Sequence, residues 1–108
     1  MTTQSRSRAA AFIHKVANTP ELPHSAVRLG AWLLALQETT GMGTIQMNKS
    51  TIMTGFRGLD GKMLQPGLPT RYKTVAEALE NLQKFDMLDV EEGEIMHGYA
   101  SYRFTMKV

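Results

Sequence analysis

Cysteine is absent from this chain of 108 residues, and so are long apolar runs. Without cysteine the protein has no disulfide, no thiolate metal ligand and no thiol nucleophile, as is common in a reducing compartment. No run of eighteen apolar residues is present to span a membrane. The first seven residues are polar and basic and lack the apolar core of a signal peptide. We therefore expect a cytoplasmic protein that makes no membrane contact.

Patterns typical of catalytic and metal sites are also missing. The histidines His14, His24 and His97 are scattered, and none has a partner at the spacing of metal ligands. Residues 41–43 (GMG) lack the lysine and the longer spacing of a phosphate-binding loop. The acidic residues of 86–94 do not follow the ligand order of a calcium loop. The sequence thus predicts no enzymatic activity, no metal site and no cofactor.

Charge is present but unevenly distributed. Residues 49–73 hold five basic residues and one acidic residue, a net charge of +4, whereas residues 77–94 hold seven acidic residues and one lysine, a net charge of −6. The whole chain carries only +2. A basic segment followed by an acidic one indicates one surface for an anionic partner and another that avoids it.

Apolar spacing predicts the secondary structure. Helical spacing indicates helices over residues 9–17, 26–38, 49–54 and 71–85, with Ser25, Asn48 and Thr70 as expected N-caps. Alternating patterns indicate strands near residues 44–47, 88–91 and 102–106, the last two forming a hairpin. Residues 56–69, rich in glycine and proline, are expected to form a mobile loop, and residues 1–8 a disordered basic tail.

This order of elements resembles the winged helix-turn-helix superfamily. In residues 79–106 (LENLQKFDMLDVEEGEIMHGYASYRFTM), two leucines three apart, a short break and a returning strand near YRFT resemble a recognition helix and its wing. Residues 47–56 (MNKSTIMTGF) look like the first helix of the turn motif. The resemblance covers residues 25–106, although the fourteen residues 56–69 replace the usual short turn. Within that superfamily, the chain most resembles small regulators and replication-initiator domains of phages and plasmids.

The resemblance implies a mainly α fold with a small β-hairpin (α+β). We expect one domain over residues 9–108, with a three-helix core, an accessory helix at 9–17 and a C-terminal wing. It implies double-stranded DNA as the partner, for transcription or replication control, with the helix near 71–85 in the groove. The expected DNA-binding residues are Lys49, Arg57, Lys62, Thr70, Arg71, Tyr72, Lys73, Thr74, Glu77 and Arg103. The same helix face is also compatible with ordinary solvation.

Two further expectations concern protein partners. The helix over residues 9–17 carries Phe12, Ile13 and Val16 and is too short to be stable alone, which favours a homodimer through this helix. In the hairpin only His97, Tyr99 and Arg103 are expected to help DNA binding, because the acidic residues around 91–94 oppose contact with phosphate. These acidic residues leave open an alternative function, a protein-interaction module that binds a basic partner through its hairpin.

Overall fold

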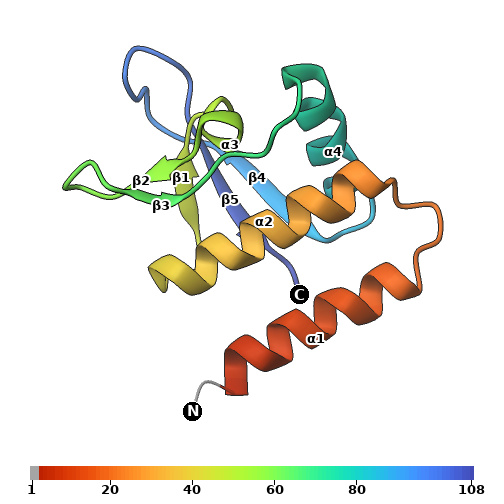
Figure 1. Cartoon of the computed structure of the whole chain (residues 1–108). Helices are drawn as coiled ribbons and strands as arrows, with labels where there is room; N and C mark the ends of the chain where they lie inside the picture. The colour runs from red at the N-terminus through yellow and green to blue at the C-terminus, as the bar shows by residue number, and fades with distance from the viewer. Residues whose placement is uncertain (1–2) are drawn as a thin grey trace.

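The structure is a computed structural model, and it describes the backbone of residues 3–108 and the side chains from Arg8 onward. The described elements follow one another in the order α1 (Thr3–Ala17), α2 (His24–Thr40), β1 (Ile45–Met47), α3 (Thr51–Thr54), β2 (Phe56–Arg57), β3 (Met63–Gln65), α4 (Tyr72–Lys84), β4 (Leu88–Glu92) and β5 (Tyr102–Met106) (Figure 1). The expected α+β class is confirmed. Within the described residues, no helix has the length and apolar character needed to cross a bilayer.

Helix α2 forms the centre of the core. Ala26, Leu29, Leu33 and Leu36 are almost fully buried because their spacing of three and four residues places them on one side of the helix. This side packs against α4 and β5. The helix ends at Gly41, whose φ of 73° is left-handed and whose N–H donates to the carbonyl of Gln37.

The sheet has the strand order β1-β5-β4, and all its pairs are antiparallel. Phe104 in the central strand faces Ile45 on one side and Val90 on the other. Because side chains alternate along a strand, Phe104 and Met106 turn to the helices while Arg103 and Thr105 turn to the outer face. The hairpin expected from residues 88–106 is therefore confirmed, and it is joined by β1 to make a third strand.

Helix α1 belongs to the same core. It begins at Thr3, six residues before the expected start, and so includes residues 3–8 of the expected tail; residues 1–2 lie outside the described residues. The Phe12 ring is 5% exposed and lies against Gly30 and Leu82. Lys15 Nζ donates to the carbonyl of Asp86 over 2.9 Å, which connects α1 to the chain beyond α4.

Burial of α1 changes the expectation of a dimer through residues 9–17. Phe12 is buried inside the protein and Val16 is half-buried against the same core. Ile13 alone of the three apolar residues is exposed, at 67%. Helix α1 thus packs against the core of its own chain, and Phe12 is buried there rather than at a dimer interface, while the dimer itself stays a prediction.

The expected mobile loop at residues 56–69 contains a small hairpin, β2 paired with β3. Two hydrogen bonds to Trp32 hold the end of β3. The Gln65 side chain donates to the carbonyl of Trp32 over 2.7 Å, and Trp32 Nε1 donates to the carbonyl of Pro66 over 2.8 Å. The N–H of Leu68 also donates to the carbonyl of Ile52. These contacts join the segment to α2 and α3, so it has more regular structure than the expected loop, while its mobility stays a prediction.

The expected helix caps were also wrong. The N-cap positions are Pro23 for α2, Ser50 for α3 and Arg71 for α4, and none of them makes a side-chain capping bond. Helix α2 consequently begins two residues earlier than the sequence suggested, and α3 and α4 begin one to two residues later. The first turn of α4 keeps N–H groups without a capping side chain.

Candidate nucleic-acid interface

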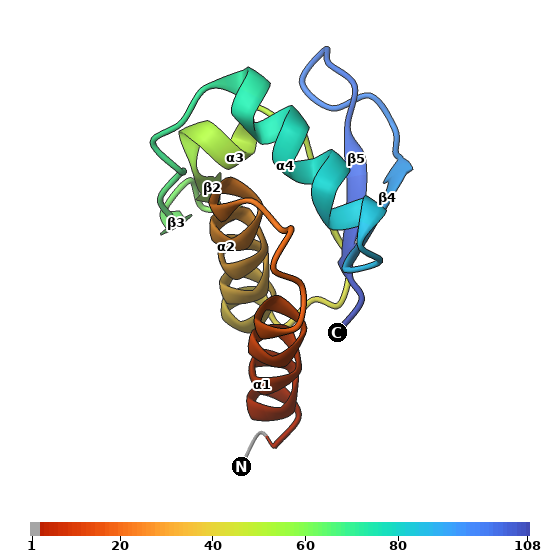
Figure 2. The same cartoon turned by 90° about the vertical axis from the view of Figure 1, so that its right-hand side faces the viewer.

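Three segments meet at one end of the molecule: α3, the start of α4 and the loop that joins β4 to β5. Figures 1 and 2 both place them at the top of the molecule, and α1 at the bottom. Three of the six basic residues expected to bind DNA, Lys49, Arg71 and Lys73, lie in or next to these segments. This end of the molecule is therefore the candidate nucleic-acid site.

Helix α4 presents one apolar side to the core and one charged side to solvent. Val75, Ala78, Leu79 and Leu82 are buried. At helical spacing the opposite side carries two lysines and two glutamates, Lys73, Glu77, Glu80 and Lys84, all exposed. The outer side of α4 is thus electrically neutral along its length.

The first turn of α4 differs from the rest of the helix. Arg71, Tyr72 and Lys73 are consecutive and exposed. No side chain caps the free N–H groups here, and the helix dipole adds a partial positive charge. Two cations and an uncapped N-terminus together favour an anionic group such as a phosphate.

Beside this turn lies an open pocket of about 500 Å³. Its lining consists of Asn48, Lys49, Ser50, Tyr72, Tyr99, Ala100 and Tyr102. All three tyrosines of the chain are among these residues. Lys49 Nζ lies 4.6 Å from the centroid of the Tyr102 ring, a cation–π contact. Lys49 and Tyr72, both expected in the DNA site, are therefore brought together here with Tyr99, which was expected to help from the hairpin, whereas Tyr102 was not expected.

Asn48 fixes the loop that carries Tyr99. Its side-chain amide donates to the carbonyl of Ala100 over 2.8 Å, with longer contacts of 3.3 Å to Met96 and 3.4 Å to Tyr99. Asn48 is 8% exposed, so these bonds are shielded from water. The loop is further closed by an isolated bridge between Met96 and Tyr99. Asn48 therefore holds the β4–β5 loop rather than capping α3.

Arg57 and Lys62 lie in the β2–β3 hairpin, outside the tyrosine pocket. Arg57 lines a second open pocket of about 680 Å³ between α3, the hairpin and His97, and its Nη1 donates to the carbonyl of Gly61 over 2.9 Å. Lys62 is exposed near the hairpin tip, which points away from α4 in Figure 1. These two cations are separate from the group at the start of α4.

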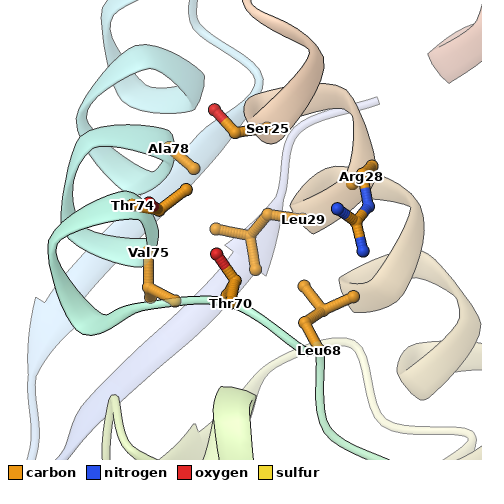
Figure 3. A pocket seen from close by; sticks show the side chains of 8 residues that line it. All are labelled: Ser25, Arg28, Leu29, Leu68, Thr70, Thr74, Val75 and Ala78. Atoms are coloured by element: carbon orange, nitrogen blue, oxygen red, sulfur yellow. The ribbon is translucent and has the colours of Figure 1, made fainter.

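Thr70 and Thr74 turn towards α2. They line a cleft of about 30 Å³ between α2 and α4, together with Ser25 and Arg28 (Figure 3). The remaining lining residues are apolar, and this volume holds about one water molecule. Neither threonine lines the tyrosine pocket.

Arg103 lies on the outer face of the sheet. Its neighbours across the strands are Gln46 on β1 and Glu91 on β4. Tyr102, the preceding residue, points to the opposite face and lines the tyrosine pocket. Arg103 and the tyrosine pocket are therefore on opposite faces of the sheet, although Arg103 and Tyr102 are consecutive in the sequence.

The acidic residues of the segment 86–94 divide into two groups. Lys107 Nζ pairs with Asp86 and lies 3.8 Å from Asp89. The hydrogen bond from Lys107 lowers the pKa of the Asp86 carboxyl below its ordinary value, and the same bond raises the pKa of Lys107. Three exposed glutamates of β4 and its loop form no ion pair with any described residue; they are Glu91, Glu92 and Glu94.

Within residues 3–108, no cluster of histidine and acidic side chains is suited to hold a metal ion. The geometry offers instead an aromatic pocket, a basic helix start and a separate acidic edge. Comparison of the chain with models of protein families, with curated proteins and with solved structures gave no match.

Proposed function

We propose that this chain is a DNA-binding winged-helix protein, a small regulator of transcription or replication that reads duplex DNA with α4. The order α2, β1, α3, α4, β4, β5 and the position of β5 between β1 and β4 agree with that fold. Helix α1 is then an accessory element, and the β2–β3 hairpin occupies the turn between α3 and α4. The β4–β5 loop is the wing.

The exposed first turn of α4 carries this proposal. Arg71 and Lys73 flank an uncapped helix start, and Lys49 lies on the same end of the molecule beside Tyr72. Phosphate groups are bound by such combinations of cations and helix N–H groups. Lys73 and Glu77, one turn apart on the outer side, are placed to reach base edges, while Arg71 and Lys49 contact phosphates.

Binding to a duplex selected from a randomised pool tests this function. Arg71→Ala and Lys73→Ala are compared with Lys84→Ala, which removes the same charge from the last turn of the same helix. Loss of a phosphate contact lowers affinity for every sequence and makes the salt slope shallower by about one unit; loss of a base contact costs about 1–3 kcal/mol at one position. Lys84→Ala should bind as the parent does.

The melting of each variant is measured first, because an unfolded helix would imitate a lost contact. If folded Arg71→Ala and Lys73→Ala both bind like the parent across several salt concentrations, α4 is not the reading helix. If the parent binds no duplex in a salt-dependent manner, the DNA function fails.

A second candidate function is a protein-interaction module that binds a basic partner. The neutral outer side of α4 and the three exposed glutamates of β4 and its loop favour it. Under this function a lysine-rich peptide binds the parent, and the combined Glu91→Gln, Glu92→Gln and Glu94→Gln variant loses that binding. Equal peptide binding by both proteins would remove this candidate.

A further inference from the structure

We propose that the tyrosine pocket, the one lined by Tyr72, Tyr99 and Tyr102 with Lys49, receives an unpaired base of DNA. The inference rests on the DNA-binding function above and adds to it a ligand class: single-stranded or locally unpaired DNA. A wholly paired duplex would leave this pocket empty.

The distribution of aromatic side chains is the first reason. Among the described aromatic residues, only Tyr72 and Tyr99 are exposed, at 54% and 72%, and both line this pocket. Leaving two rings in water in one place gives up the stabilisation that their burial would provide. A base offers a flat π-surface that covers such rings, and stacking of this kind accepts any base sequence.

The rings come from elements that hold them in place. Tyr72 starts α4, and Tyr99 lies in the loop that Asn48 fixes. Tyr102 is half-buried, with its ring centroid 6.4 Å from that of Phe104 and a tilt of 58°. Three rings held on separate elements form a prearranged site, which reduces the entropy lost when a ligand is ordered.

The polar groups match a nucleotide. Lys49 supplies a cation at the pocket wall and can move from the Tyr102 ring to a phosphate at little cost, because it forms no ion pair among the described residues. Arg71, next to Tyr72 in the sequence, is exposed at the uncapped start of α4. The pocket volume of about 500 Å³ lies within the range of small-ligand sites, about 300–1,000 Å³.

Paired bases are already stacked on their neighbours, so only a base outside a duplex can lie between these rings. The duplex-reading side of α4 and the pocket are adjacent because Tyr72 and Lys73 are consecutive residues. A DNA that contains both paired and unpaired segments can therefore contact both at once.

The test compares two labelled strands of equal length with the full chain, one of thymidine and one containing abasic sites. Both have the same phosphates, so their difference reports the bases. The parent should bind the thymidine strand about 5- to 150-fold more tightly. Tyr99→Ala should abolish most of this difference, and Tyr99→Phe should retain it because the ring remains.

The lysines separate charge from stacking. Lys49→Ala should weaken binding of both strands and reduce the salt slope by about 0.7. Lys84→Ala is the matched control, since Lys84 also lies over a ring, 5.5 Å from the centroid of Phe85, at the far end of α4. It should leave both affinities unchanged. Tyr72→Ala provides a second stacking variant, and melting confirms that each variant folds.

Failure of this inference and failure of the proposed function give different results. Equal binding of the thymidine and abasic strands by the parent overturns the base pocket, while salt-dependent duplex binding then still supports the DNA function. Retention of the full difference by both folded tyrosine-to-alanine variants also overturns it. Absence of binding to every strand and duplex overturns both.

Discussion

Replacing Gly30 by alanine should change stability in opposite directions depending on the residue at position 12. Gly30 lies inside α2, where alanine is normally favoured over glycine by about 1 kcal/mol. A Cβ atom at this position would lie 2.5 Å from Cζ and 2.7 Å from Cε1 of the Phe12 ring. The ring is 5% exposed and cannot turn away without disturbing the core. Overpacking costs about 1–3 kcal/mol, so Gly30→Ala should lower the stability of the parent by up to about 2 kcal/mol.

The sign should reverse once the ring is removed. Phe12→Ala alone should cost about 3–5 kcal/mol, because it leaves a void between α1, α2 and α4. In that background the new methyl group at position 30 meets no ring and fills part of the void. Gly30→Ala should then stabilise the protein by about 1 kcal/mol. The difference between the two backgrounds is a coupling of about 1–3 kcal/mol, as expected for residues in contact.

Urea unfolding of the parent, both single variants and the double variant measures the four free energies. Ile13→Ala, the exposed neighbour of Phe12, is the control and should change stability by about 0.5 kcal/mol or less. If Gly30→Ala stabilises the parent and Phe12→Ala has little effect, the ring does not lie against Gly30. Helix α1 would then pack elsewhere, and a dimer through it would regain Phe12.

Three other perturbations test the structure. Asn48→Ala should cost about 1–3 kcal/mol by leaving loop carbonyls without a donor, and hydrogen exchange should accelerate in the β4–β5 loop; unchanged exchange would contradict the role given to Asn48. Gly67→Ala should destabilise the fold severely in thermal melts, because its Cβ would overlap the backbone of Met53, which cannot yield as a side chain does; an unchanged melting temperature would refute this packing. NMR titration should find the pKa of Asp86 below its ordinary value in the parent and normal in Lys107→Ala. The ion pair therefore stabilises the folded state above the unfolded-state pKa of Asp86, and this stabilisation is lost as the pH falls through the lowered folded-state pKa. An ordinary pKa of Asp86 in the parent would show that the pair does not form.

Local periodicity was enough to predict the elements that depend on it. The apolar stripe from Val75 to Leu82 predicted α4, and the alternation of apolar and polar residues predicted β4, β5 and their pairing. These features follow from the spacing of apolar residues along one segment, because each segment has a single buried side. The placement of Lys49 and Tyr72 in one site followed from the same order of elements.

The features that were missed depend on contacts between distant segments. The end of the β2–β3 hairpin is held by hydrogen bonds to Trp32, more than thirty residues away. The glycine and proline content of the segment does not reveal such contacts. Asparagine is a common N-cap residue, yet the side-chain amide of Asn48 donates instead to a loop carbonyl fifty-two residues later. Tyr99 was expected only as a helper in the hairpin, because its neighbours in the sequence are acidic, glycine-rich and irregular; the pocket that it shares with Tyr72 and Lys49 was missed.

At the proposed interface the basic residues and the aromatic rings have different roles, which the sequence alone does not show. The outer side of α4 has equal numbers of lysines and glutamates, so a long electrostatic contact with a duplex along the helix gains little. Attraction is concentrated at its first turn, beside the pocket where the exposed rings gather. The exposed glutamates of β4 and its loop repel phosphate on the neighbouring edge. A DNA with an unpaired base next to a short duplex would place phosphates at the basic turn and a base between the rings, while a uniform duplex satisfies only the first contact. We therefore expect DNA structure, more than net charge, to determine which DNA this protein binds most tightly.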